Sequence, residues 1–250
     1  MNLFGTTRSH VRRTHALIAP DSHVGSDVPG WERSRGIILI SPRMGARFAQ
    51  YLALMEPGGT AGPAPPDVER VLYVLEGQVA LTLPGADERT LETGGFAYCP
   101  PGAAVTLRAV AASRLNLFEK RYLGRPGLVA PGPFCGHEQE IDGTPFLGDP
   151  DAILKVLLPV DPRFDLAVNV FTYQPGATLP LVEVHVMEHG LLMLEGQGVY
   201  RLGDEWYPVT QGDAIWMAPF CPQWFVAMGK STARYLYYKD VNRDSIEEAP

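Results

Sequence analysis

The amino-acid sequence predicts an all-β protein made of two tandem barrel domains. Its 23 prolines and 26 glycines interrupt short runs that are rich in Val, Leu, Tyr and Phe, a pattern typical of strands joined by turns. Helical periodicity is nearly absent. The runs also form two sets that repeat each other at an offset of about 119 residues, which is the length of one domain rather than of one solenoid unit.

The predicted strands divide the chain into two similar halves. They are residues 36–40, 48–55, 71–75, 79–83 and 115–119 in the first half, and 167–173, 191–194, 198–202, 214–218 and 235–239 in the second. The stretch 131–144 is rich in Pro and Gly and is predicted to link the halves. We therefore expect an N-terminal domain at residues 1–130 and a C-terminal domain at residues 131–250.

Matching turns and strand ends indicate a tandem duplication. The stretch Leu-Glu-Gly-Gln occurs at 75–78 and again at 194–197, and a Pro-Gly pair occurs at 57–58 and again at 175–176. Near the end of each half, residues 119–121 are expected to correspond to residues 238–240, which would make Lys120 the counterpart of Lys239.

Composition and charge exclude several kinds of partner. The net charge of −7 comes from scattered acidic residues, and without a cluster of Lys or Arg there is no surface to neutralise phosphates. Nucleic acid and membranes are therefore not expected as partners. No stretch has the roughly 20 apolar residues of a membrane helix or the pattern of a signal peptide, so a cytoplasmic protein is predicted. The three cysteines lack CxxC spacing and are expected to be buried, without a disulfide or a thiolate metal site.

The order of motifs in each half resembles the cupin family. Each half runs from a Pro-Gly turn through an apolar run, Glu-Gly-Gln, a strand and a glycine turn to a Pro-rich corner. Cupins are small jelly-roll barrels, in which two histidines and a glutamate of a first motif and a histidine of a second motif bind a metal. The resemblance implies a bicupin, that is, two tandem cupin domains in one chain.

In the C-terminal half, the first cupin motif is present with its ligand types permuted. Glu183 stands at the place of the first histidine, His185 follows two residues later, and His189 stands at the place of the glutamate. Alternating residues on a strand share a face, so these three side chains can all point into the barrel, whereas Glu188 is expected to face away. Gln223 occupies the place of the second motif's histidine.

This ligand set contains two imidazoles, one carboxylate and one amide oxygen but no sulfur, which suits Mn²⁺, Fe²⁺, Ni²⁺ or Zn²⁺. Four protein ligands on an octahedral ion would leave two neighbouring positions for substrate or water, as in a catalytic site. Two histidines four residues apart are by themselves usually ordinary core or surface residues. Their place in the cupin motif favours the metal site.

The N-terminal half lacks these ligands. Its residues at the four corresponding positions are Ala64, Pro66, Arg70 and Val105. Arg70 is always cationic and is a poor metal ligand. We expect this barrel to be free of metal and to serve as a scaffold or as a surface for oligomerisation.

The permuted order Glu-x-His-x-x-x-His with a distant Gln resembles the (S)-ureidoglycine aminohydrolases of purine and allantoin breakdown. The resemblance spans nearly the whole chain. It includes SPRMGARF at 41–48, YCPPG at 98–102, HG at 189–190, EGQGVY at 195–200 and YYKDVNRD at 237–244.

This resemblance implies a cofactor and a set of site residues. One Mn²⁺ per chain would be bound by Glu183, His185, His189 and Gln223. The substrate pocket would include Tyr200, Tyr235 and Lys239. Tyr235 and Lys239 lie four residues apart on one predicted strand and hence on one face. Either tyrosine could also be an ordinary barrel aromatic, but a lysine in an aromatic strand is costly to bury unless its charge is used.

The reaction implied is the hydrolytic release of ammonia from (S)-2-ureidoglycine, which gives (S)-ureidoglycolate. Mn²⁺ would orient the substrate and act as a Lewis acid. Lys239 would carry a proton between the attacking water and the leaving amine, and Glu183 is the alternative base. The sequence leaves both assignments open.

Two other functions fit the same residues. A metal-dependent cupin oxygenase or isomerase could use a His/His/carboxylate set with open positions. A non-catalytic ligand-binding cupin would use the same fold without chemistry. Oxygen consumption would identify the first, and ammonia release would exclude the second. A small-molecule ligand and a homo-oligomer are expected in every case.

Overall fold

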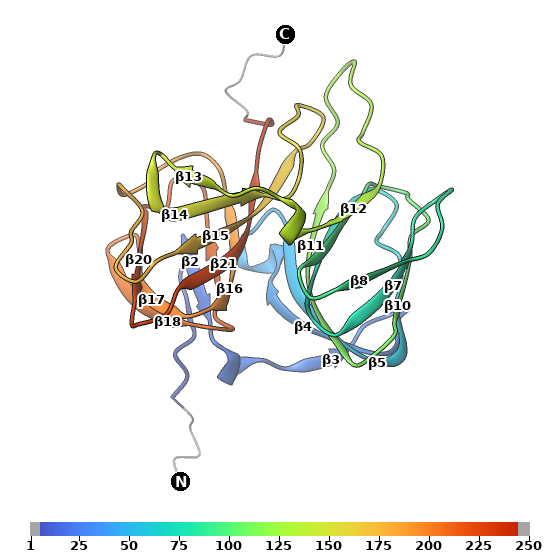
Figure 1. Cartoon of the computed structure of the whole chain (residues 1–250), viewed down its shortest axis with the longest axis horizontal. Coiled ribbons are helices and arrows are strands. Elements are labelled where there is room, and N and C mark those ends of the chain that lie inside the picture. The colour runs from blue at the N-terminus through green and yellow to red at the C-terminus, as the bar shows by residue number, and fades with distance from the viewer. Residues whose placement is uncertain (1–5, 245–250) are drawn as a thin grey trace. The chain divides into compact units, whose positions relative to one another are not determined.

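Strands account for most of the computed structural model, which describes residues 6–244. Within this range the chain forms 21 strands and three short 3₁₀ helices, Pro20–Ser22, Pro42–Met44 and Glu138–Glu140 (Figure 1). The predicted all-β class is confirmed. None of the helices in the described part of the chain has the length and apolar character needed to cross a membrane. The three cysteines are free, and two of them, Cys99 and Cys221, are buried.

The chain folds into two compact units. In the described range, the N-terminal unit comprises residues 24–142, 155–168 and 240–244, and the C-terminal unit comprises residues 6–23, 143–154 and 169–239. The division of the repeats at residue 130 stays a prediction. Packing does not follow chain order, because the first described segment folds together with the second half of the chain.

The N-terminal unit is built around one ten-stranded antiparallel sheet. Its strands are β3 (Gly25–Asp27), β4 (Glu32–Ile40), β5 (Ala49–Ala61), β6 (Val68–Glu76), β7 (Gln78–Thr82), β8 (Arg89–Glu92), β9 (Gly95–Cys99), β10 (Thr106–Ala109), β11 (Ser113–Arg121) and β12 (Phe134–His137). They run in the order β12-β9-β6-β11-β5-β10-β7-β8, with β4 paired to β5 and to β3. The long strand β5 pairs with both β11 and β10, so the sheet curls around a core that includes Tyr51, Leu72 and Leu117.

Two sheets make up most of the C-terminal unit. The larger joins β1 (His10–Val11), β2 (His15–Ile18), β19 (Ala214–Met217), β16 (His189–Glu195), β21 (Ala233–Asp240), β15 (Leu166–Tyr173), β14 (Asp149–Val156) and β13 (Thr144–Phe146), in that order. The smaller joins β18 (Glu205–Thr210), β17 (Gln197–Leu202) and β20 (Gln223–Met228). Alternating residues of both sheets, among them Phe171, Tyr200 and Phe225, form one core.

The first described segment completes the larger sheet of the C-terminal unit. Strand β2 pairs with β19, so that Ala16 lies opposite Trp216. Arg8 binds the buried carboxylate of Asp213 through two hydrogen bonds of 2.7 and 2.8 Å. Because β19 also supplies Met217 to the cavity described below, this segment supports one wall of the candidate site.

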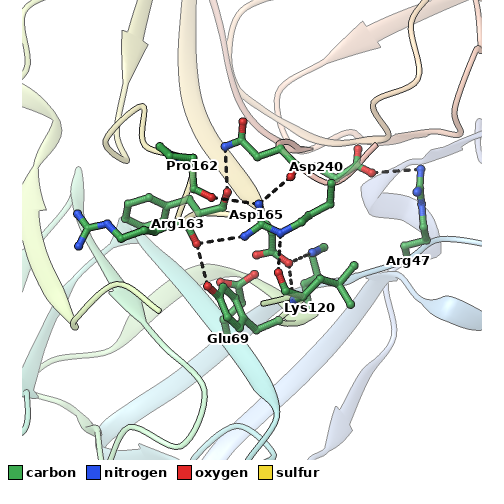
Figure 2. A network of polar contacts seen from close by, with 12 residues as sticks. Arg47, Glu69, Lys120, Pro162, Arg163, Asp165 and Asp240 are labelled. Carbon is green, nitrogen blue, oxygen red and sulfur yellow. Dashed lines mark hydrogen bonds and ion pairs between the residues drawn. The ribbon is translucent and has the colours of Figure 1, made fainter. Parts of the chain in front are cut away.

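Two ion pairs, one of them buried, hold the late segments 155–168 and 240–244 in the N-terminal unit (Figure 2). Lys120 on β11 pairs with the fully buried Asp165, whose carboxylate also accepts a 2.7 Å hydrogen bond from the backbone amide of Leu123. Arg47 pairs with Asp240 at 3.1 Å. Charge pairing therefore fastens the end of β21 within this unit.

Strand pairing gives a different correspondence between the last strands of the two repeats than the expected match of residues 119–121 with residues 238–240. Arg70 lies opposite Glu119 in the pair β6 and β11, and His189 lies opposite Lys239 in the pair β16 and β21. Lys239 therefore corresponds to Glu119, and the expected correspondence with Lys120 is wrong. The chain between the paired positions is one residue longer in the second repeat, and the register is set by the strand pairing rather than by chain spacing.

Candidate metal centre and active site

A cavity of about 140 Å³ lies inside the C-terminal unit. All residues predicted for the site line it, namely Glu183, His185, His189, Tyr200, Gln223, Tyr235 and Lys239. The rest of the lining is apolar or aromatic and consists of Phe146, Phe171, Met187, Leu191, Met217 and Tyr237. Predicted residues up to 56 positions apart in the chain, Glu183 and Lys239, thus meet at one place. The functional roles of these residues remain predictions.

Strands carry five of the predicted residues. His189 is the first residue of β16 and Gln223 the first of β20, while Tyr200 lies on β17 and Tyr235 and Lys239 lie on β21. Tyr235, Tyr237 and Lys239 occupy every second position of β21. Side chains at alternate positions of a strand lie on the same face, and here that face points into the barrel. The strands of both sheets therefore deliver polar groups to the same cavity.

The expectation that Glu183, His185 and His189 alternate along one strand is wrong. Glu183 forms only an isolated bridge with Gln223, through backbone hydrogen bonds of 2.9 and 3.0 Å. The carbonyl of His185 accepts a 2.7 Å hydrogen bond from the amide of Phe220, whose φ of 62° is left-handed and uncommon for a residue other than glycine. These backbone contacts hold the segment 183–185 at the cavity.

The two imidazole rings face each other through their Nε2 atoms, which lie 3.2 Å apart. The Nδ1 atom of His189 lies 3.2 Å from the carbonyl oxygen of Tyr238, and the Nδ1 atom of His185 lies 3.2 Å from that of Met187. Because a carbonyl only accepts, each Nδ1 is the donor, and the Nε2 atom of a neutral imidazole with this tautomer presents a lone pair. Burial lowers the pKa of His189 to about 3, so its ring is neutral. Two converging lone pairs are the arrangement that a cation stabilises.

The amide group of Gln223 completes this cluster of donors. Its Nε2 atom lies 3.1 Å from Nε2 of His185, and its Oε1 atom accepts a long hydrogen bond of 3.4 Å from the Tyr200 hydroxyl. The oxygen and nitrogen of an amide exchange places on a half-turn of the terminal bond. After that half-turn, the amide oxygen faces the imidazole lone pairs and the amide N–H₂ faces Tyr200. The donor set then fits a divalent ion that accepts nitrogen and oxygen ligands.

Glu183 lines the cavity but is less closely joined to the ligand atoms. Within residues 6–244, no three His, Cys, Asp or Glu side chains are close enough together to hold an ion. Burial raises the pKa of the Glu183 carboxyl, and the charges of His185 and Lys239 partly oppose this shift. A carboxyl group with a raised pKa can exchange protons nearer to neutral pH. This property suits a base as well as a ligand.

Tyr200, Tyr235 and Lys239 supply the other polar groups of the cavity. Both tyrosines are almost completely buried, and burial raises the pKa of each phenol above its usual value. They are therefore neutral hydroxyl groups that can donate a hydrogen bond. Lys239 is half-buried and lies opposite His189 across the strand pair. The cavity thus offers two neutral donors and one amine beside the candidate metal ligands.

Sequence reasoning missed the aromatic part of the lining. Phe171 packs edge-on against Phe146 at 4.9 Å between ring centroids and stacks on Tyr237 at 5.6 Å. Tyr237 lies two residues from Tyr235 on β21, and Phe171 lies two residues from Tyr173 on β15. Residues two apart on a strand face the same side, so this alternation is a signal that could have identified both aromatic residues. Phe146 follows the predicted linker and belongs to the short strand β13, and nothing in its local sequence indicates a place in the site.

Glu188 does not line the cavity, although the regular strand on which that expectation relied does not include it. Its buried carboxylate accepts a 2.8 Å hydrogen bond from the indole Nε1 of Trp216. In the N-terminal half, Tyr98 donates a 2.9 Å hydrogen bond to Glu69, which precedes Arg70 as Glu188 precedes His189. This glutamate and its aromatic donor are a shared structural feature of the two repeats.

Two family profiles match the two halves of the chain. One family is described as a cupin domain and matches residues 169–238, and the other is described as an EutQ-like cupin domain and matches residues 44–122. Together with the two barrel-forming sets of strands, these matches show that the protein is a bicupin.

Proteins that are similar to this chain over nearly its full length identify the family within the cupins. The chain is 44% identical to (S)-ureidoglycine aminohydrolase of Arabidopsis thaliana over 98% of this chain and 82% of that protein. It is 36% identical to the (S)-ureidoglycine aminohydrolase of Escherichia coli (strain K12) over 92% of this chain and 89% of that protein. A solved structure, described as the putative glyoxylate induced protein from Pseudomonas aeruginosa, matches with a TM-score of 0.89 and 32% identity and covers 100% of this chain and 96% of that one. The chain belongs to the (S)-ureidoglycine aminohydrolase family of hydrolases.

Proposed function

We propose that this protein hydrolyses (S)-2-ureidoglycine to (S)-ureidoglycolate and ammonia. The oxygen of water bonds to the carbon that carries the amine, and the bond from that carbon to the amine nitrogen breaks. The observation that carries the proposal is the convergence of the Nε2 atoms of His185 and His189, 3.2 Å apart, in a cavity that also contains the amine of Lys239. The names of the relatives support the same reaction.

Mn²⁺ is the ion proposed for this cavity, one per chain. The imidazoles of His185 and His189, the amide oxygen of Gln223 and the carboxylate of Glu183 would hold it. Nitrogen and oxygen donors without sulfur suit Mn²⁺ and its neighbours in the first row. When bound, the ion supplies Lewis acidity and a point of attachment for a substrate that bears a carboxylate.

The dimensions and lining of the cavity suit a small polar substrate. Its volume of about 140 Å³ is well below the roughly 300 Å³ at which pockets for drug-sized ligands begin. The hydroxyl groups of Tyr200 and Tyr235 can donate hydrogen bonds to carboxylate or ureido oxygens. The stacked rings of Phe171 and Tyr237 exclude water from the other part of the cavity, which strengthens these hydrogen bonds.

Proton transfer is assigned to Lys239, with Glu183 as the alternative base. The attacking water must lose a proton and the leaving amine must gain one, so a group that can do both is needed at the reacting carbon. Lys239 lines the cavity, and its charge acts on the carboxyl of Glu183. The two groups are therefore neighbours, and a proton can pass through either of them.

Ammonia release tests the proposed function directly. Freshly formed (S)-2-ureidoglycine, made in place from allantoate by its amidohydrolase, is supplied to the purified protein as isolated, after chelation, and after Mn²⁺ is added back. Release that is abolished by chelation and restored by Mn²⁺ is expected. Elemental analysis should also find one Mn²⁺ per chain in the wild type and little in His185→Ala, with His10→Ala on the exposed strand β1 as the control.

A metal-loaded protein that releases no ammonia would contradict the proposal. The metal-dependent oxygenase or isomerase would then become the leading function, because two imidazoles and a carboxylate with open positions also suit Fe²⁺. Consumption of oxygen during turnover would support that alternative. Ligand binding without oxygen consumption or ammonia release would support a non-catalytic binding protein.

Association into a homo-oligomer is part of the proposal. Large apolar side chains next to the segment 183–185 are exposed, with exposed fractions of 53% for Leu181, 55% for Val184 and 58% for Phe220. Large contiguous exposed apolar patches mark interaction sites, and these side chains are proposed to form part of one. Light scattering coupled to size-exclusion chromatography should find more than one chain per particle, and a monomer at micromolar concentration would contradict this part.

A further inference from the structure

The hydroxyl group of Tyr235 contacts a second, more deeply placed tyrosine. Tyr173 ends β15, is completely buried, and is not among the residues that line the cavity. Its hydroxyl oxygen lies 2.9 Å from that of Tyr235. Its ring packs against Phe171, Phe225 and Tyr235 at centroid distances of 5.1, 5.1 and 5.6 Å. Tyr173 therefore stands behind a cavity-lining phenol, in a fixed position.

The number of available partners determines the direction of this hydrogen bond. Among the described residues, Tyr235 is the hydrogen-bond partner of the Tyr173 hydroxyl. Burial raises the pKa of both phenols, so each keeps its single proton. If Tyr235 were the donor, the proton of Tyr173 would be buried without an acceptor, which is unfavourable. Tyr173 is therefore the donor and Tyr235 the acceptor.

Accepting from Tyr173 leaves the one proton of Tyr235 for another acceptor. The neighbouring Tyr200, whose ring centroid is 6.3 Å away, is hydrogen-bonded to Tyr235. Its hydroxyl oxygen also lies 3.4 Å from Oε1 of Gln223. With the amide turned toward the imidazoles, its N–H₂ group donates to Tyr200. Both cavity phenols then accept a hydrogen bond from a buried donor. Without substrate, the proton of Tyr235 contacts the hydroxyl group of Tyr200, and a substrate oxygen in the cavity would take the place of that acceptor.

We propose that Tyr173 is a positioning residue that holds the Tyr235 hydroxyl so that Tyr235 donates a hydrogen bond to a carboxylate or ureido oxygen of the substrate. This inference rests on the proposed function, because it concerns the substrate of the same site. A donor that is oriented before the substrate arrives loses less freedom on binding. Tyr173 acts only through Tyr235 and does not touch the substrate.

A double-mutant cycle tests this coupling. Ammonia release is measured for the wild type, Tyr173→Phe, Tyr235→Phe and the double variant. Tyr173→Phe should lower kcat/KM about tenfold, mainly by raising KM, as expected when one neutral hydrogen bond to the bound substrate is weakened. In the Tyr235→Phe background, Tyr173→Phe should cause no further loss, because no hydroxyl remains to be positioned. A further loss of similar size would show a general structural role and overturn the inference.

Tyr98→Phe is the matched control for removing a buried phenol hydroxyl. Tyr98 is also completely buried and donates one hydrogen bond of 2.9 Å, to Glu69 in the N-terminal unit. Its replacement should change kcat/KM by less than about twofold, since it shares no partner with the cavity. Circular dichroism confirms that all variants are folded at the assay temperature. An equal loss in Tyr98→Phe and Tyr173→Phe would overturn the inference.

A stable analogue separates this inference from the proposed function. N-carbamoylglycine has the carboxylate and the ureido group of ureidoglycine but lacks the amine that leaves. In calorimetry, Tyr173→Phe should weaken its binding about tenfold when Tyr235 is present and leave it unchanged in Tyr235→Phe. This pattern without ammonia release would reject the proposed reaction and keep the role of Tyr173. Absent binding, or equal binding by wild type and Tyr173→Phe, would overturn the inference.

Discussion

The two halves of the chain place different chemistry at the same point of a cupin barrel. In the C-terminal half, His189 and Lys239 lie opposite each other on neighbouring strands and line a cavity of about 140 Å³. In the N-terminal half, the corresponding residues are Arg70 and Glu119, and the pocket that Arg70 lines measures about 20 Å³. Corresponding strand pairs of the two repeats thus enclose the candidate site in the C-terminal half, whereas the interior of the N-terminal half is nearly filled.

The difference lies in how the buried groups satisfy one another. Arg70 forms an ion pair with Glu119 at 2.6 Å and donates hydrogen bonds of 2.7 Å to Glu119 and to the carbonyl of Gly62, so charge and hydrogen bonds are balanced within the protein. In the C-terminal half, His185 and His189 use Nδ1 for backbone carbonyls and direct Nε2 at each other. The C-terminal barrel, in which a metal ion is proposed to bind, is therefore the one whose buried nitrogen atoms lack a matching donor within the protein.

Exchanging the residues at the corresponding positions of His189 and Arg70 should have the largest effect on metal content and activity. His189→Arg brings the N-terminal residue into the C-terminal cavity, replacing a neutral donor with a cation. We expect loss of bound Mn²⁺ and a fall in ammonia release of more than about a hundredfold, which is the upper range for losing a group that merely supports a ligand. Elemental analysis and the ammonia assay measure both effects.

The reverse exchange is the control for that experiment. Arg70→His should leave metal content and activity unchanged, because Ala64, Pro66 and Val105 add no further ligands in the N-terminal half. Metal retained at one ion per chain in His189→Arg would show that the ion is held elsewhere. The comparison of the two barrels would then lose its chemical basis.

Removing the amine opposite His189 should lower activity without removing the ion. Lys239→Ala is expected to reduce ammonia release about 10²- to 10⁴-fold, the range for a lost acid-base group, with Mn²⁺ content unchanged. Lys230→Ala, at an exposed lysine before β21, is the control and should keep full activity. Normal turnover by metal-loaded Lys239→Ala would transfer the proton-carrying role to Glu183.

Breaking the ion pair of the N-terminal half should reduce stability instead of activity. Glu119→Gln leaves the charge of Arg70 buried without its counter-ion, which we expect to lower the free energy of unfolding by about 3 kcal/mol. Urea titration measures the loss. Glu56→Gln removes one partner of an exposed pair, in which the side chains of Arg33 and Glu56 are 62% and 72% exposed, and should change the free energy by less than about 1 kcal/mol. Equal effects would contradict the prediction.

The smallest expected difference between the two halves concerns the pH dependence of stability, through the buried glutamates Glu69 and Glu188. Glu69 and Glu188 occupy corresponding positions, and Glu69 lies beside a second buried carboxylate, Asp165. Burial and then the contact with Asp165 raise the pKa of Glu69 to about 9, against the opposing effects of Lys120 and Tyr98. The folded state therefore keeps a proton that the unfolded chain releases near pH 4.5. The stability that this proton contributes is complete below that pH and is lost as the pH rises toward 9.

Glu69→Gln tests this effect while preserving the neutral side chain. The amide can still accept from Tyr98 and donate to Asp165. The decline in the free energy of unfolding between about pH 5 and pH 9 should become less steep than in the wild type. Urea titrations at intervals of pH measure the slope, with Glu92→Gln on the exposed strand end as the control. Identical slopes for Glu69→Gln and the wild type would contradict the assignment.

The sequence was sufficient to predict most of the fold and a set of residues that line one cavity, because these depend on local patterns. Alternation and turn residues indicated the strands, and the repeat indicated two barrels. The motif spacing led to Glu183, His185, His189 and Gln223, which all line the cavity. The prediction of a regular strand through Glu183 and His185 was wrong. Hydrogen bonds from the amide of Phe220 and with the backbone of Gln223 hold that segment in place. Such contacts join residues that are distant in sequence.

The sequence by itself determined which side chains are available: two imidazoles, an amide, a carboxylate, two phenols and an amine in one repeat, and an arginine in place of a histidine in the other. Only the tertiary structure decided that Glu119 rather than Lys120 corresponds to Lys239, and that Tyr173 stands behind Tyr235. The physical reason is that residue type and spacing are properties of the chain, whereas strand register and the partner of a buried hydroxyl are properties of surfaces that meet only after folding.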